Sequence, residues 1–237
     1  MIIQTKAIVL QAIKYQDKSL IVKCLTEEVG IQTFFVRNAF SKGKNAPKIA
    51  YFQPLMLLDV TFAFKNKGGM EYFKEIKVDQ VYQTIYYDFS KNSIALFVSE
   101  ILSMIVSEQE RDKQFYAFVE TALLWLDTHE ETANFHLLLL VELTKYLGFY
   151  PDVSEVTCHY FDWYEGVFTD IHVANCFDAE ETFLLKRLLQ LGFDSDQKVF
   201  SSRDRKTLLT LLMKYYEVHF TAFKKPKSLE VLKEVFA

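Results

Sequence analysis

The chain has 237 residues, of which half are apolar and 24% are charged, and this composition excludes a disordered protein. Its apolar runs are far shorter than the roughly 20 residues needed to cross a bilayer, and the N-terminus lacks the charged-then-apolar order of a signal peptide. We therefore expect a cytoplasmic protein with no membrane contact. Three cysteines without a CxxC pair argue against a disulfide framework and against a four-cysteine metal site.

Charge is distributed unevenly along the chain. The formal net charge is −4, but residues 1–80 carry +5, residues 81–202 carry −13 and residues 203–228 carry +5. No acidic residue lies between Glu28 and Asp59. This separation predicts a basic surface on an otherwise acidic protein, which favours a polyanionic partner such as nucleic acid. Chance clustering of solvated lysines is the alternative interpretation.

The first 80 residues are typical of β-structure. Short segments rich in Val, Ile, Phe and Thr alternate with turn signals. We expect strands at Ala7–Ala12, Ser19–Thr26, Gly30–Arg37, Pro54–Phe64 and Met70–Val78. Five short strands with no helical period predict a barrel of the OB type over residues 1–80, with a five-stranded open sheet as the competing arrangement.

After residue 80 the apolar period becomes that of a helix. Helices are expected at Phe89–Val106, Asp112–Thr128, Thr132–Leu147, Ala179–Leu191 and Arg203–Phe220, followed by a last helix capped by Ser228. Ser90 is the expected N-cap of the first helix, and Gly148 is expected to end the buried central one. The predicted fold class is α+β, with the barrel followed by an all-helical domain over residues 81–237 that contains an irregular excursion at about 149–177.

No catalytic motif stands out. The patterns GxxxxGKS/T, GxGxxG and GxSxG are missing, so nucleotide hydrolysis and acyl transfer lack their usual motifs. Four residues could supply enough ligands for a zinc site, namely Cys158, His159, His172 and Cys176. However, the side chains of the neighbouring residues 158 and 159 point in divergent directions, and the spacing matches no common zinc module. We therefore expect a binding protein without metal or cofactor. An enzyme that uses residues 149–177 is the alternative.

The basic residues of the first 80 residues gather around two loops. The predicted nucleic-acid-binding residues are Arg37, Lys42, Lys44, Lys48, Lys65 and Lys67. Lysines on loops meet phosphates without reading sequence. Phe40, Tyr51 and Phe52 lie among them, and exposed aromatic rings can stack on bases, although packing at the end of the barrel would equally explain these rings.

A second basic stretch lies near the C-terminus. Its candidate surface residues are Arg203, Lys206, Lys214 and Lys224. This stretch could extend a nucleic-acid path or receive an acidic partner peptide, and an ordinary solvated helix face is the alternative.

Several segments together resemble the RecO family of recombination mediators. They are the strand Ala7-Ile8-Val9-Leu10, the turn at Tyr15 and Asp17, the hairpin Leu25-Thr26 to Gly30, Phe52-Gln53-Pro54-Leu55, Tyr146-Leu147-Gly148 with Pro151, and the closing Tyr215-Tyr216, His219 and Lys227-Ser228-Leu229. The spacer that the family places between leucine and threonine is missing at Leu25-Thr26. The resemblance spans nearly the whole chain, and it depends on the order and spacing of these segments rather than on one motif.

The resemblance implies an OB-fold joined to a helical domain, binding of single- and double-stranded DNA, and annealing of complementary strands. The partners that it implies are RecR, the acidic C-terminal tail of single-stranded DNA-binding protein and, indirectly, the recombinase RecA. Many members carry a four-cysteine zinc module after the central helix, whereas this chain has only Cys158 and Cys176 there. We therefore expect a variant that lacks zinc. The alternative function is a protein adaptor that makes no direct contact with DNA.

Overall fold

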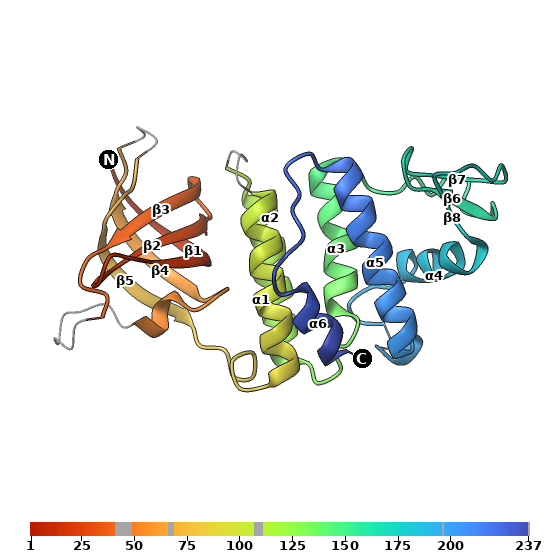
Figure 1. Ribbon diagram of the computed structural model, residues 1–237. Helices are drawn as coiled ribbons and strands as arrows, with labels where there is room; N and C mark the ends of the chain where they lie inside the picture. Colours follow the sequence, from red (N-terminus) through yellow and green to blue (C-terminus); the bar gives the residue numbers. More distant parts are fainter. Residues whose placement is uncertain (41–48, 66–68, 107–110, 196, 237) are drawn as a thin grey trace. The chain divides into compact units, whose positions relative to one another are not determined.

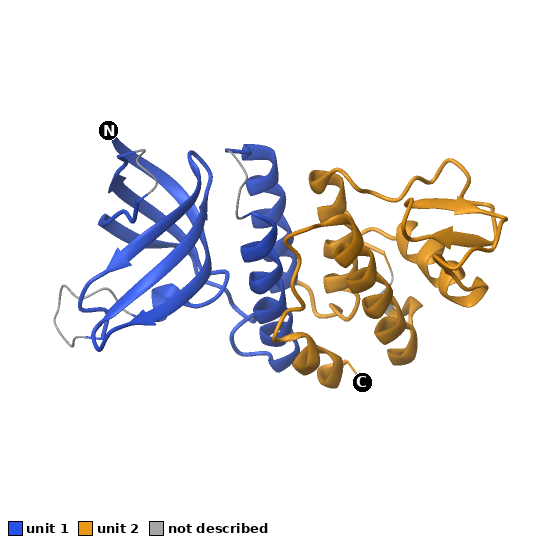
Figure 2. Ribbon diagram, turned by 45° about the horizontal axis from the view of Figure 1, so that its top comes forward, with its two compact units in different colours: residues 1–128 blue, residues 129–237 orange. Residues whose placement is uncertain are grey.

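The computed structural model describes residues 1–40, 49–65, 69–106, 111–195 and 197–236. The chain forms two compact units, residues 1–128 and residues 129–237 (Figure 2). Each is described separately below. No helix in the described ranges has both the length and the apolar character needed to span a bilayer.

The first unit begins with a five-stranded antiparallel sheet that is rolled into a barrel (Figure 1). Its strands are β1 (Ile2–Tyr15), β2 (Ser19–Thr26), β3 (Gly30–Val36), β4 (Leu57–Ala63) and β5 (Phe73–Gln80), in the order β3-β2-β1-β4-β5. The Phe35 N–H donates to the Glu71 carbonyl at 2.9 Å, and the Glu71 N–H donates to the Thr33 carbonyl at 2.8 Å. These two bonds join β3 to the segment just before β5, so the sheet closes as the predicted OB-like barrel does.

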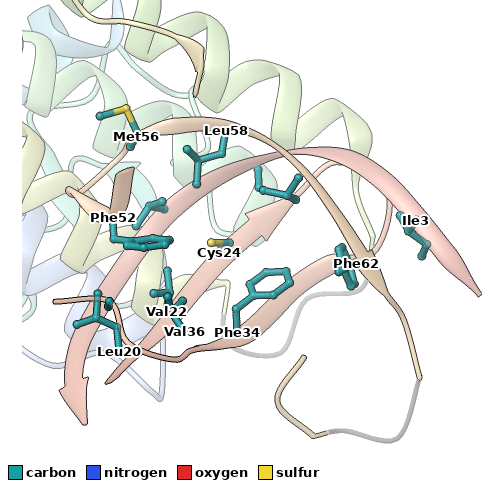
Figure 3. Close-up of a cluster of buried hydrophobic side chains, with 14 residues drawn as sticks. Ile3, Leu20, Val22, Cys24, Phe34, Val36, Phe52, Met56, Leu58 and Phe62 are labelled. Carbon is teal, nitrogen blue, oxygen red and sulfur yellow. The ribbon is translucent and has the colours of Figure 1, made fainter. Parts of the chain in front are cut away.

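The long strand β1 holds the barrel together because it pairs on both sides. Its first half pairs with β4 and its second half with β2, and the register shifts between Val9 and Gln11. A bulge at this place bends the strand, which lets one strand serve two neighbours around a closed sheet. The inward positions form one apolar cluster (Figure 3), whose labelled members are Ile3, Leu20, Val22, Cys24, Phe34, Val36, Phe52, Met56, Leu58 and Phe62. Burial raises the pKa of the Cys24 thiol, so this cysteine acts as a small apolar side chain.

Helices α1 (Phe89–Ile105) and α2 (Lys113–Thr128) complete the first unit. The N-cap of α1 is Asp88, whose carboxylate accepts the Lys91 N–H, so the prediction of Ser90 as N-cap was wrong. Ser90 instead lies within the first turn, because Asp88, a capping residue of similar strength, stands two positions earlier where the helix begins. The Lys23 ammonium of β2 donates to the Ser103 carbonyl at 2.7 Å, which places a cation at the C-terminal end of α1.

The segment that joins the barrel to α1 is fastened by Asp127, near the end of α2. The Asp127 carboxylate accepts the backbone N–H groups of Gln83 (2.8 Å), Thr84 (2.8 Å) and Ile85 (3.1 Å). Burial alone would raise the pKa of Asp127, but these donors stabilise the charged form and hold the pKa below its usual value. The boundary predicted at residue 80 follows β5 directly, whereas the first compact unit continues to residue 128.

The second unit consists of helices and a small three-stranded sheet. Its elements are α3 (Phe135–Leu147), β6 (Tyr160–Asp162), β7 (Val167–Thr169), β8 (Cys176–Phe177), α4 (Ala179–Leu189), α5 (Ser202–His219) and α6 (Leu229–Val235). α3 is buried along most of its length and ends at Gly148, which adopts a φ of 80°. The Tyr216 hydroxyl of α5 donates to the Leu140 carbonyl of α3 at 2.7 Å, which ties these two helices together. The sheet β7-β6-β8 occupies the predicted irregular excursion, and its short strands pair around the buried side chain of Phe161.

Candidate nucleic-acid interface

An aromatic side chain on the outer face of β3 is followed closely by a basic residue. Phe34 and Val36 are buried in the barrel, so alternation along the strand turns Phe35 outward, and Arg37 follows in the turn directly after β3. Arg37 is exposed, and Phe35 is half-buried. These two residues are the starting point of the site.

Two further rings meet Phe35 on this face. Tyr15, the last residue of β1, makes an edge contact with Phe35 at 5.8 Å between ring centroids. Tyr72, just before β5, makes a second edge contact with Phe35 at 5.9 Å. Tyr15 and Tyr72 are each 43% exposed. We call Tyr15, Phe35 and Tyr72 the aromatic row, and it brings together three segments far apart in the sequence.

Two cations lie over one ring of the aromatic row. The Arg37 guanidinium carbon is 5.2 Å, and the Lys65 ammonium nitrogen 5.8 Å, from the centroid of Tyr72. At these distances the ring face attracts a cation, which restricts both flexible side chains to one region of the surface. Among the described residues, neither cation forms an ion pair with a carboxylate. Both charges therefore stay available to an external anion.

The buried residue Glu71 fixes the position of this cluster. Its backbone bridges to Thr33 and Phe35 on β3, and its side-chain Oε1 accepts the Lys65 N–H at 2.9 Å. One residue thus connects the segment carrying Tyr72, the root of the loop carrying Lys65, and β3. The closure of the barrel and the assembly of the site depend on the same contacts.

Three other basic residues of the first unit form ion pairs within the protein. Lys6 pairs with Glu120 at 2.9 Å and with Asp79 at 3.6 Å, and the hydrogen bond to Glu120 raises the pKa of Lys6. Arg111 and Lys113 both contact Glu28. These pairs lower the free positive charge around the barrel, so Arg37 and Lys65 differ from them in being uncompensated.

The structure brings two of the six predicted DNA-binding residues together. Arg37 and Lys65 share the ring of Tyr72. Lys42, Lys44, Lys48 and Lys67 lie outside the described residues. Of the suggested stacking residues, Phe52 is buried in the barrel and Tyr51 packs against its core, whereas Phe40 is 42% exposed with the Lys14 ammonium 5.7 Å from its centroid.

Sequence reasoning missed the aromatic row and Lys14. The alternation in β3 was sufficient to mark Phe35 as an outward position once Phe34 and Val36 were assigned to the core. Nothing local in the sequence indicates that Tyr72 meets Phe35, because this contact depends on the closure of the barrel between segments about 35 residues apart.

Comparisons with known proteins match both halves of the chain. Residues 1–82 match the family Recombination protein O N terminal, and residues 86–230 match Recombination protein O C terminal. The chain belongs to the RecO family. DNA repair protein RecO of Flavobacterium johnsoniae is 52% identical over 235 residues, which are 99% of each chain, and that of Flavobacterium psychrophilum is 51% identical over 236 residues with the same coverage. The Bacteroides fragilis protein of the same name is 33% identical over the full length of both chains.

These matches confirm the resemblance and the fold class predicted from the sequence. In this member of the RecO family, the C-terminal basic residues gather on α5. Arg203, Lys206 and Lys214 are exposed at helical spacing along one face, and Lys224 is exposed in the segment after the helix. A groove between α5 and α6 is lined by Thr210, Met213, Lys214, Glu217, Lys225, Leu229 and Lys233.

The residues considered for zinc have other contacts in this RecO chain. His159 Nδ1 lies 2.7 Å from an Asp170 carboxylate oxygen, and the His172 ring packs edge-on against Tyr160 at 4.8 Å between centroids. In the part of the chain that the structure describes, no three His, Cys, Asp or Glu side chains gather as metal ligands would. A variant without zinc remains the prediction.

Proposed function

We propose that this protein is a recombination mediator in DNA repair that binds DNA through its barrel. Membership of the RecO family supports the repair role, since relatives at up to 52% identity are named DNA repair protein RecO. The observation that carries direct DNA binding is the pair of uncompensated cations, Arg37 and Lys65, held over Tyr72 beside exposed rings. Such a surface offers both charge for phosphates and faces for bases.

We propose that four further lysines, which lie outside the described residues, contribute to this interface. Lys42, Lys44 and Lys48 follow β3 in the sequence, and Lys67 is two residues from Lys65. A binding surface made of lysine and arginine without a base-reading scaffold favours contacts to phosphates, which do not depend on sequence. We therefore propose DNA binding that is strong at low salt and independent of sequence.

A titration of labelled oligonucleotides by fluorescence polarisation tests the DNA-binding proposal. Affinity should fall steeply as salt rises, because each neutralised phosphate releases counterions. The Lys42→Ala/Lys44→Ala/Lys48→Ala variant should weaken binding and flatten the salt dependence by about one unit of slope per lost contact. Unchanged binding in this variant would reject the placement of these contacts, and salt-independent binding of the wild type would reject the proposal as a whole.

We further propose that the protein anneals complementary strands and, with RecR, helps to load RecA onto DNA coated by single-stranded DNA-binding protein. A protein that acts on chromosomal DNA in this way would work in the cytoplasm, at the nucleoid during repair. An annealing assay with complementary oligonucleotides, with and without single-stranded DNA-binding protein and RecR, tests the annealing step. Acceleration by the wild-type protein supports annealing, and no acceleration of naked strands would reject it. The same mixture with RecA added tests loading, which should raise the rate of RecA binding to coated strands, and an unchanged rate would reject the loading role.

The groove between α5 and α6 is the proposed site for the acidic tail of single-stranded DNA-binding protein. Lys214, Lys225 and Lys233 line the groove together with Glu217, around the buried side chains of Met213 and Leu229. Lys225 pairs with Glu217 at 3.8 Å and Lys233 pairs with Glu230 at 3.0 Å, so the lining keeps an excess of positive charge over an apolar floor. A labelled tail peptide should bind the wild type and lose affinity in Lys214→Glu/Lys225→Glu. Peptide binding that this variant leaves intact would move the site elsewhere.

We also propose that the protein acts by binding and carries out no catalytic step of its own. A pull-down with RecR in nuclease-treated buffer separates the mediator from a pure adaptor. An adaptor would retain RecR while failing to shift any oligonucleotide in the titration above.

A further inference from the structure

Two rings of the aromatic row, Tyr15 and Tyr72, have different surroundings. Tyr72 carries two cations over its ring, whereas Tyr15 forms only the edge contact with Phe35 in the described part of the chain and is 43% exposed. A ring whose faces attract cations is less open to a base than a ring without them. Tyr15 is therefore the member of the row best placed to receive a base.

We infer that Tyr15 determines a preference for unpaired over paired strands, and that Tyr72 is a positioning residue for Arg37 and Lys65. This inference rests on the proposed function of the barrel and deepens it. The ligand class is single-stranded nucleic acid with accessible base faces. The supporting observations are the contact of Tyr15 with Phe35 and the two cations over the ring of Tyr72.

The surroundings of Tyr15 favour a stacked base. Phe35 supports the ring at 5.8 Å with an interplanar angle of 78°, and this fixes its orientation. Ile13, two residues earlier on β1, is 51% exposed, so the ring has an exposed apolar neighbour on the same strand. A planar base that stacks here removes apolar surface from water, and this makes binding more favourable.

Duplex DNA cannot use this ring in the same way. Its bases stack on one another inside the helix and present only their edges in the grooves. Phosphates, by contrast, are available on both forms of DNA. Loss of Tyr15 should therefore weaken the binding of single strands alone, whereas loss of the Tyr72 ring should weaken both forms because Arg37 and Lys65 lose their common support.

The experiment compares three tyrosine variants on two ligands. Tyr15→Leu, Tyr72→Leu and the control Tyr87→Leu are titrated against a short oligo-thymidine and against a blunt-ended duplex of two complementary strands over a series of salt concentrations. Tyr87 is a matched control because it lies in the same compact unit, is 84% exposed and does not belong to the row. Circular dichroism melting verifies that each variant is folded.

Tyr15→Leu should weaken single-strand binding about tenfold, the loss typical of one base–aromatic stack, with an unchanged salt slope and unchanged duplex affinity. Tyr72→Leu should weaken both ligands and reduce the salt slope, whereas Tyr87→Leu should change neither. Equal losses on both ligands in Tyr15→Leu, or no loss on either, would overturn the inference. If the wild type binds neither ligand, the proposed function itself fails, so the two failures are distinguishable.

A second readout avoids dependence on the leucine variant. Tyr15→Phe keeps the ring and should retain the single-strand preference of the wild type. Photocrosslinking of the full chain to an oligonucleotide that contains iododeoxyuridine should attach the base to Tyr15, as read by peptide mass spectrometry. Crosslinks that map only outside the aromatic row would overturn the inference even if Tyr15→Leu does not fold.

Discussion

Basic side chains are used differently in the two units of this protein. In the barrel, Arg37 and Lys65 lie over an exposed ring and meet no carboxylate among the described residues. In the second unit, the Lys214 ammonium lies 3.8 Å from the centroid of Trp163, and Lys225 lies 3.8 Å from a Glu217 oxygen. An ion pair with a carboxylate, as at Lys225, offsets the charge that a phosphate would meet, whereas a contact with a ring, as at Tyr72 and Trp163, leaves the charge in place. A count of positive residues along the chain therefore overstates the charge that Lys225 offers to an external anion.

Aromatic side chains differ in how the exposed rings are grouped. In the barrel the exposed Tyr15 and Tyr72 both contact Phe35, whereas the second unit buries Phe161, Phe168 and Phe177 in one cluster and exposes Tyr164 and Phe183 apart from that cluster. Exposed rings can stack on bases, but buried rings stabilise the fold. The two units thus contain similar residue types, but we expect only the barrel to present grouped exposed rings to a nucleic acid. Paired substitutions, one in each unit, test this contrast.

The largest expected effect comes from removing one core ring in each unit. Phe34 is fully buried and stacks on Phe73 at 4.0 Å, and Phe161 is 1% exposed in the second unit. Phe34→Ala and Phe161→Ala should each lower the free energy of unfolding by about 3–5 kcal/mol, measured by urea denaturation. Only Phe34→Ala should also weaken oligonucleotide binding under conditions where both variants stay folded, because β3 carries Phe35 and leads directly into Arg37. Equal losses of affinity would break the comparison.

The second prediction concerns acid. Burial, with a smaller contribution from nearby Arg205, lowers the pKa of His136 in the second unit from 6.5 to about 3. Below pH 6.5 the imidazole of His136 is protonated in the unfolded chain but stays neutral in the folded unit. The contribution of His136 to the free energy of unfolding is therefore present above pH 6.5 and is lost as the pH falls toward 3. The expected loss is about 2 kcal/mol between pH 7 and pH 5.

The first unit should lose stability only at lower pH than the second unit. The pKa of Asp127 is lowered in the folded state, so its contribution is present above the unfolded value of about 3.9 and is lost only as the pH falls through the folded value. Hydrogen exchange followed from pH 7 to pH 5 should therefore show the second unit losing protection first, and His136→Gln should reduce this loss. Earlier loss of protection in residues 1–128 would contradict the assignment.

A smaller effect is expected at the end of α3. Gly148 has a φ of 80°, and a Cβ added there would meet no atom within 4 Å, so only backbone strain opposes a side chain. Gly148→Ala should cost about 1 kcal/mol of stability in the second unit and leave oligonucleotide affinity unchanged. Thermal melting together with polarisation measures both effects. A loss of DNA affinity in this variant would indicate that the second unit contributes directly to binding.

The sequence predicted the elements better than it predicted the site. Strands and helices could be predicted because the apolar period changes near residue 80. The end of α3 could be predicted because glycine adopts the left-handed conformation that often ends a helix, as Gly148 does. Ser90 was chosen as a cap by residue type alone, although Asp88 lies two positions earlier and caps the helix. The choice between two capping residues depends on where the chain turns, and local sequence does not specify this.

The aromatic row could not be read from the sequence because it depends on contacts between distant segments. Tyr15, Phe35 and Tyr72 belong to different segments, and the bridge at Glu71 brings the last two together. The sequence identified Arg37 and Lys65 by their charge, but it did not indicate that both lie over the ring of Tyr72. Conversely, Phe52 appeared among basic residues in the sequence and proved to belong to the core.

The most direct test compares two pairs of cations by the salt dependence of single-strand binding. Arg37→Ala/Lys65→Ala should reduce the slope of the logarithm of affinity against the logarithm of salt by about 1.4, as expected for two lost phosphate contacts. Lys206→Ala/Lys214→Ala, a matched pair on α5, should reduce it by less than half as much. An equal or larger reduction in the α5 pair, or an unchanged slope in the barrel pair, would contradict the claim that the barrel provides the DNA-binding surface.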